Sequence, residues 1–131
     1  MKTRTLLIII LLVAVVMVVI AGGSKNKGAD VNAKNYKEYT ELMSASYHGH
    51  REIAKLLIEE GADVNDQCQL GYTALIEASV KGHIDIVKLL IEAGADVNLQ
   101  DEGGYTALKY ASREGHTDIV KVLEDAGAKE Y

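Results

Sequence analysis

Three histidines recur every 33 residues in this chain, at His50, His83 and His116, and each directly follows a glycine. Imidazole nitrogens on one repeating face could in principle hold a metal ion. Zinc ligands, however, lie about 2 Å from the ion, whereas stacked structural units are separated by about 10 Å, the thickness of a helix. We therefore predict no metal site, and we expect these histidines to form hydrogen bonds between neighbouring units.

Catalytic chemistry is equally poorly supported by the residues. Cys68 is the single cysteine, which excludes an intrachain disulfide; a reactive thiol and a substitution without a chemical role are both open, and the second is favoured. No serine or cysteine stands in a recognisable motif with a histidine and a carboxylate. The tripeptide Asp-Val-Asn occurs at residues 30–32, 63–65 and 96–98. Its side-chain oxygens could bind calcium, but the segments lack the spacing of a calcium loop, so we interpret them as turns. We predict no catalytic residues, no cofactor and no enzymatic activity.

The periodicity extends well beyond the histidines. Tyr-Thr pairs begin at Tyr39, Tyr72 and Tyr105. A longer motif, Gly-Ala-Asp-Val-Asn, also recurs, and a truncated copy of it begins at Gly127. Self-similarity at such a period indicates stacked supersecondary units. The longer motif, Gly-Ala-Asp-Val-Asn, occupies residues 28–32, 61–65 and 94–98.

Within one unit the residues predict two short helices. Thr73 is a suitable N-cap for a helix over Ala74–Lys81, and Gly82 can adopt the left-handed conformation that ends it. Apolar residues then recur at helical spacing over Ile84–Ile91, and Gly94 ends this second helix in the same way. One such pair cannot bury its apolar sides alone, so neighbouring pairs must stack.

At these residues the chain resembles the ankyrin repeat family. The family's Thr-Pro-Leu-His motif corresponds to Thr40–Met43, Thr73–Ile76 and Thr106–Lys109, in which the proline and the histidine are replaced. The resemblance implies an all-α fold, a solenoid of three helix-turn-helix repeats with protruding loop or β-turn fingers. The apolar run near the N-terminus adds an expected hydrophobic helix before the array. The expected repeats are 28–60, 61–93 and 94–126, with a C-terminal remnant at 127–131.

The third repeat is predicted to end the array. Terminal repeats need a polar outer face, and two apolar residues of the second repeat become charged 33 residues later. Ile76 is replaced by Lys109, and Ile91 is replaced by Glu124.

The N-terminal segment is expected to direct the chain out of the cytosol. Lys2 and Arg4 precede an apolar run, Leu6–Ala21, which is followed by a short linker at 22–27. This order is typical of a signal peptide cleaved after Ala21, and the alternative is an uncleaved membrane anchor. In both readings Lys2 and Arg4 remain on the cytosolic side of the membrane, and the repeats are exported to the periplasm or secreted.

The family resemblance implies a partner-binding surface on the concave face, formed by the finger tips and the first helices. Tyrosine is enriched among binding hot spots, and we expect Tyr39, Tyr72 and Tyr105 to form a ladder that projects away from the helices. The alternative is that each tyrosine covers a helix N-terminus of its own repeat. The predicted partner-binding residues are Tyr36, Lys37, Tyr39, Tyr47, Gln69, Leu70, Tyr72, Lys81, Glu102, Tyr105 and Arg113.

Charge narrows the class of partner. All 19 acidic residues, but only ten of the 14 Lys and Arg residues, lie beyond position 27. Nucleic acid is therefore an improbable ligand, and a basic protein fits better. We predict a monomeric, exported protein–protein interaction module, with an inhibitor or an immunity factor for an exported enzyme as specific forms. The alternative is a membrane-tethered scaffold that organises partners beside the bilayer.

Overall fold

A computed structural model describes residue 4 and residues 30–130 of the 131-residue chain. This part contains six α-helices and, apart from an isolated bridge between Lys34 and Thr40, no β-structure. The all-α expectation is therefore confirmed for these residues. The helices are α2 (Glu41–His48), α3 (Arg51–Glu59), α4 (Ala74–Lys81), α5 (Ile84–Glu92), α6 (Ala107–Arg113) and α7 (Thr117–Asp125).

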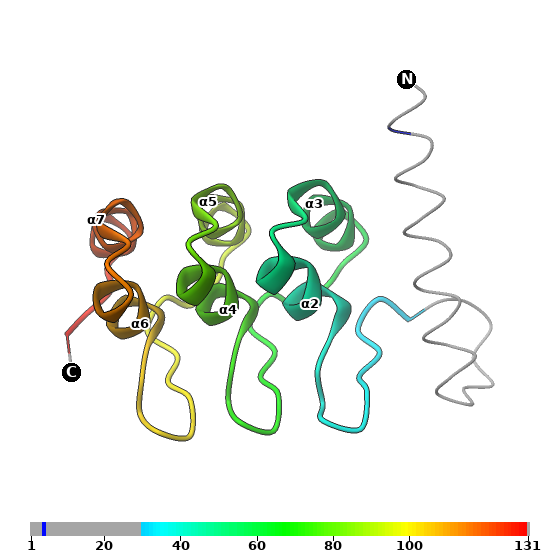
Figure 1. The fold of residues 1–131 in the computed structure, drawn as a ribbon. Helices are drawn as coiled ribbons and strands as arrows, with labels where there is room; N and C mark the ends of the chain where they lie inside the picture. Colours follow the sequence, from blue (N-terminus) through cyan, green and yellow to red (C-terminus); the bar gives the residue numbers. More distant parts are fainter. Residues whose placement is uncertain (1–3, 5–29, 131) are drawn as a thin grey trace.

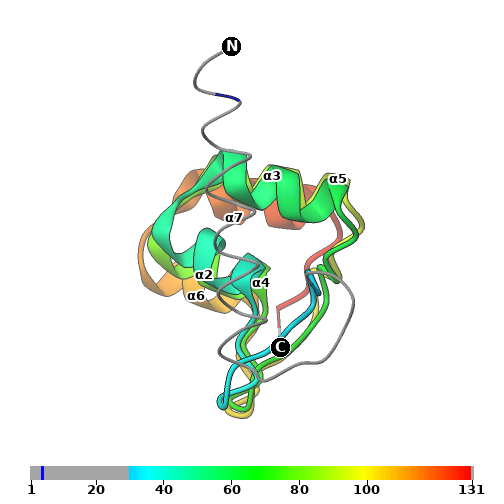
Figure 2. The ribbon, with the colours of Figure 1, turned by 90° about the vertical axis from the view of Figure 1, so that its right-hand side faces the viewer.

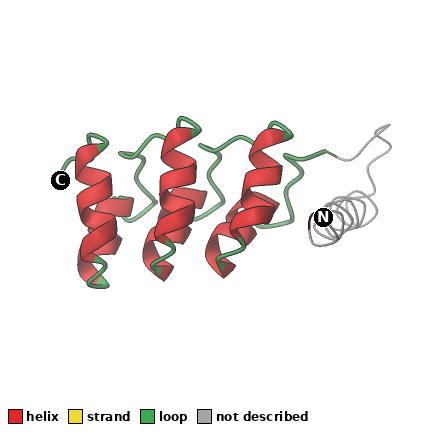
Figure 3. Cartoon of the chain, turned by 90° about the horizontal axis from the view of Figure 1, so that it is seen from above, coloured by secondary structure: helices red, strands yellow, loops and turns green. Residues whose placement is uncertain are grey.

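The helices form two layers, and long loops project from one side (Figure 1). We call α2, α4 and α6 the inner helices, because they adjoin the loops, and α3, α5 and α7 the outer helices. Each inner helix packs against the next inner helix, and each outer helix against the next outer helix. Seen from above, the three helix pairs stand side by side (Figure 3). Viewed along the stack, the three loops nearly superimpose (Figure 2).

Threonine caps explain where the inner helices begin. The Oγ1 atom of Thr73 accepts a hydrogen bond from the backbone N–H of Ile76 at 3.1 Å, and Thr40 and Thr106 make the equivalent bond in their own repeats. Gly82 then ends α4 with φ of 80°, a left-handed conformation that side chains disfavour. The predicted bounds of the helix over Ala74–Lys81 are confirmed.

Polar side chains tie neighbouring repeats together. His83 Nε2 lies 3.0 Å from the carbonyl oxygen of Tyr47, and His116 Nε2 lies 3.1 Å from that of Val80. These bonds confirm the predicted connection between adjacent repeats for His83 and His116. Asn65 extends the predicted turn chemistry, because its side-chain oxygen accepts the N–H of Asp96 in the next repeat at 2.7 Å while its own N–H donates to Asp63.

The core lies between the two helix layers and continues through all three repeats. Leu57, Leu90 and Leu123 occupy equivalent positions of the outer helices, and each is 0% exposed. Towards the C-terminal end the pattern changes as predicted: Ile76 is 1% exposed, whereas its equivalent Lys109 is exposed. The replacement of an apolar by a charged residue at this position therefore coincides with the last of the three described repeats.

The expected hydrophobic helix, cleavage site and linker at residues 1–27 lie outside the described residues. Within the part of the chain that is described, no helix is long and apolar enough to cross a membrane.

Candidate functional site

Large apolar side chains that remain exposed mark the finger side of the array. Within residues 30–130 these are Tyr36 at 82%, Leu70 at 57%, Tyr105 at 40% and Tyr47 at 37% exposed. Tyr36 and Leu70 stand at the tips of the first and second loops, Tyr105 lies at the base of the third, and Tyr47 lies in the last turn of α2. An exposed aromatic or leucine side chain contributes nothing to the core, so these four are free to contact a partner.

Hydrogen bonds between the loops fix the spacing of the tips. We call residues 34–39, 67–72 and 100–105 the three fingers. The N–H of Gln69 donates to the carbonyl of Lys37 at 3.1 Å, and its side-chain Nε2 donates to the carbonyl of Tyr36 at 3.2 Å. In the next junction the N–H of Glu102 donates to the carbonyl of Leu70 at 3.0 Å. The predicted contact residues Lys37, Gln69 and Glu102 thus also hold the fingers in a row.

The tyrosine ladder is only partly formed. Tyr39 is half-buried against the core and donates its hydroxyl hydrogen to Glu77 Oε1 at 3.0 Å, in the following repeat. Tyr72 is also packed against the core, and its ring meets that of Tyr110 edge-on at 6.2 Å. The expectation that these two side chains project away from the helices was wrong. The cause is the next repeat, whose inner helix places Glu77 or Tyr110 against the ring.

Tyr105 escapes this packing because no further repeat follows it among the described residues. Its ring instead contacts Tyr110 of its own repeat edge-on, at 5.6 Å. One member of the predicted ladder is therefore an exposed contact, and the other two support junctions between repeats.

Glu77 is the carboxylate most deeply placed in the predicted binding region. It is 8% exposed, and burial raises its pKa above the ordinary value of 4.5. The hydrogen bond from Tyr39 and the nearby charges of Lys81 and His48 oppose this shift. Burial and the adjacent Glu77 carboxylate also raise the pKa of the Tyr39 hydroxyl. The pair therefore closes the junction between repeats one and two with a shielded polar contact.

A second group of predicted residues lies at the ends of the inner helices. Lys81 Nζ stands 4.5 Å from the ring centroid of Tyr47, a cation–π contact that reaches from one repeat to the preceding one. The His48 ring meets Tyr47 edge-on at 4.9 Å and stacks on His50 at 5.8 Å. The structure thus brings Tyr47 and Lys81 together, with His48 beside them.

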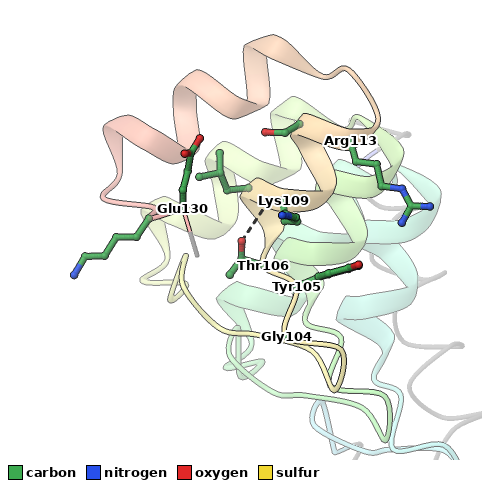
Figure 4. Close-up of a pocket in the computed structure, with 9 residues that line it drawn as sticks. Gly104, Tyr105, Thr106, Lys109, Arg113 and Glu130 are labelled. Atoms are coloured by element: carbon green, nitrogen blue, oxygen red, sulfur yellow. Dashed lines mark hydrogen bonds between the residues drawn. The ribbon is translucent and has the colours of Figure 1, made fainter.

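The third repeat arranges its predicted residues differently. Tyr105 and Arg113 line an open pocket of about 540 Å³ at the C-terminal end of the stack, together with Lys109 and Lys129 (Figure 4). We call this the end pocket. Sequence reasoning treated Lys109 only as a solubilising residue and did not consider Lys129. The signal was present, because Lys129 stands 33 residues after Asp96, so an acidic position becomes basic in the last unit.

Comparison with protein families agrees with this geometry. A family model described as ankyrin repeats (three copies) matches residues 13–101 and again residues 42–130. The chain belongs to the ankyrin repeat family. A search of curated proteins finds no match. Ankyrin repeats are protein interaction modules, and in this ankyrin array the fingers and the end of α2 present the large exposed apolar groups of residues 30–130.

Cys68 has a structural position in this ankyrin domain. It is a free thiol, 9% exposed, and belongs to the apolar core cluster at the base of the second finger. Such burial favours packing over reactivity. Among the described residues no group of three or more histidine, cysteine or acidic side chains is placed to hold a metal ion.

Proposed function

We propose that this ankyrin array binds one partner protein through the exposed side chains of its fingers and inner helices. The observation that carries the proposal is the exposure of large apolar groups at the finger tips, Tyr36 and Leu70, and at Tyr47 near the end of α2. Fingers held together by hydrogen bonds form a preorganised surface, which lowers the cost of ordering on binding.

The charge of the chain favours a basic partner. Three lysines of the fingers and inner helices already contact groups of the protein itself. Lys34 pairs with Asp66 at 2.7 Å, and Lys37 and Lys81 lie over tyrosine rings. The remaining excess of acidic groups attracts positive charge. The partner is thus a protein that offers apolar side chains within a basic surface.

Export of the repeats is the second part of the proposal. The basic residues Lys2 and Arg4 ahead of the apolar run Leu6–Ala21 support it. In the exported form the array acts as an interaction module, such as an inhibitor or immunity factor for an exported enzyme. If the run is retained, the same surface serves as a scaffold tethered beside the bilayer. The mass of the mature chain separates the two forms, since cleavage leaves a product that starts at Gly22.

The binding surface is tested by affinity capture with the tagged chain from the native extracellular fraction, followed by calorimetry with the protein recovered. Leu70→Ala and Tyr36→Ala should each weaken binding, the stronger anchor by about 2 kcal/mol. Lys88→Ala and Glu92→Ala, exposed on α5, serve as controls and should bind normally. Equal affinities for all four variants would place the binding surface elsewhere.

A further inference from the structure

The C-terminal end of the array carries an unusual set of charges. Three positions near this end are basic although the residues 33 positions earlier are apolar or acidic. Lys109 and Arg113 of the third repeat correspond to Ile76 and Val80 of the second, and Lys129 of the C-terminal remnant corresponds to Asp96 of the third. Any polar residue would keep this exposed face hydrated, so solubility alone does not require basic residues here. The rest of the array is acidic. The three basic residues therefore gather positive charge at one end of a negative molecule, where Glu130 also lines the pocket and Glu124 is exposed on α7.

These cations surround the end pocket. Figure 4 shows Tyr105, Lys109 and Arg113 on one side of it and Glu130 on the C-terminal segment at the other. Lys109, Arg113 and Lys129 are all exposed. Within residues 30–130 the ion pairs are Lys34–Asp66 and Arg51–Glu52, so none of the three is neutralised by a described carboxylate.

A backbone acceptor stands one residue before Gly104, which lines this pocket. In the first two fingers the carbonyls of Lys37 and Leu70 each accept an N–H from the next finger, at 3.1 and 3.0 Å. The equivalent residue of the third finger is Gly103, next to Gly104 in the pocket wall. Among the described residues, none donates a hydrogen bond to the Gly103 carbonyl. The ladder of fingers therefore ends with an open acceptor.

We propose that the end pocket binds an acidic peptide segment of a partner protein in an extended conformation. A backbone N–H of the peptide continues the ladder by donating to the Gly103 carbonyl, as an added strand does at an open edge. Its carboxylates lie against Lys109 and Arg113, where opposite charges attract. Tyr105, with Lys109 Nζ 6.0 Å from its ring centroid, provides an apolar wall.

Charge and shape together select a peptide over other anions. The pocket volume, about 540 Å³, lies in the range of ligand sites. A fully ionised small anion such as sulfate would use the cations but leave the Gly103 carbonyl without a donor, because it has only acceptors. A nucleic acid carries donors on its bases, but its phosphates would be repelled by the acidic remainder of the array. A peptide supplies the donor and the negative charge at once.

The test measures binding of a fluorescein-labelled peptide of alternating glutamate and alanine to the full chain by fluorescence anisotropy. The double variant Lys109→Gln with Arg113→Gln should weaken binding about tenfold, as expected for the loss of two partly exposed charge pairs. The matched control is Lys88→Gln with Lys121→Gln on the outer helices, which changes the net charge equally and should leave the affinity within about twofold. Circular dichroism confirms that both remain folded.

Two further peptides test separately the contribution of the peptide's negative charge and that of its backbone N–H groups. A peptide with glutamine in place of glutamate should lose most of the affinity, and one with N-methylated backbone amides should bind more weakly than its parent. No measurable binding of the glutamate peptide, or equal losses in the two double variants, would overturn the proposal. Equal binding of the methylated peptide would overturn the role of the Gly103 carbonyl.

Discussion

The two C-terminal-facing surfaces of repeats two and three share one backbone geometry but have opposite roles. Repeat two presents Ile76, which is 1% exposed because α6 covers it. Repeat three presents Lys109 at the same position, exposed and facing an open pocket. The comparison teaches that a position in a stacked array is structural when another repeat covers it and available for binding when none does. Tyr72 and Tyr105 obey the same rule.

The largest effect is expected from exchanging residues across this comparison. Ile76→Lys should destabilise the protein by about 4 kcal/mol or more, because it places an unpaired charge between repeats two and three. Lys109→Ile should change the free energy of unfolding by no more than about 0.5 kcal/mol. Urea denaturation measures both, and similar costs would mean that the two surfaces are not opposite in burial.

A pair of glycines sharpens the same comparison. Gly71 and Gly104 share a left-handed backbone, with φ of 81° and 80°. A Cβ at Gly71 would lie 2.8 Å from the Asp101 Cα of the next finger, whereas one at Gly104 meets no atom within 4 Å. We expect Gly71→Ala to cost about 3 kcal/mol and Gly104→Ala about 1 kcal/mol.

The conformation alone does not explain the larger cost, because Glu38 occupies the equivalent position of the first finger with φ of 59°. Thermal denaturation of the two alanine variants tests this interpretation. If both lost the same stability, the close approach of fingers two and three would be without consequence.

A pH dependence is expected at the junction of repeats one and two. Burial raises the pKa of Glu77 in the folded state, so the folded protein retains this proton to higher pH than the unfolded chain does. Ionisation of Glu77 therefore weakens the folded state as pH rises from the ordinary value through the raised one.

Glu77→Gln removes this ionisation and keeps an oxygen that can accept from Tyr39. Relative to this variant, the wild type should become less stable as pH rises above the ordinary glutamate value. Denaturant midpoints across that range are the measurement, and Glu92→Gln, exposed on α5, is the control. A constant difference between wild type and Glu77→Gln would contradict the shift.

The smallest predicted effects concern the helix starts, where repeats two and three are alike. Ala74 and Ala107 are the first residues of α4 and α6, where a missing N–H has no cost, and the preceding threonines are extended. Proline at either position should stabilise the fold by about 0.4–1 kcal/mol. A lower denaturant midpoint for Ala74→Pro or Ala107→Pro would contradict this.

The sequence predicted the helix caps because they depend on residues within one 33-residue unit, and it predicted the repeats and the polar end face because equivalent positions can be compared along the chain. It did not predict the fate of Tyr39 and Tyr72, since that depends on Glu77 and Tyr110 of the following unit. The end pocket was missed for a related reason. Lys109, Arg113 and Lys129 come together only when α6 and the C-terminal segment are placed in space, although the change from Asp96 to Lys129 was visible.

The most direct test asks whether partner binding and the stacking of repeats depend on different side chains of the fingers. Calorimetric affinity for the captured partner and the melting temperature are measured in parallel for Leu70→Ala, at an exposed tip, and Tyr39→Phe, which loses the bond to Glu77. The account predicts that Leu70→Ala weakens binding without lowering the melting temperature, and that Tyr39→Phe costs about 1–3 kcal/mol of stability while affinity is retained. Normal binding by Leu70→Ala together with weakened binding by a stable Tyr39→Phe would contradict it.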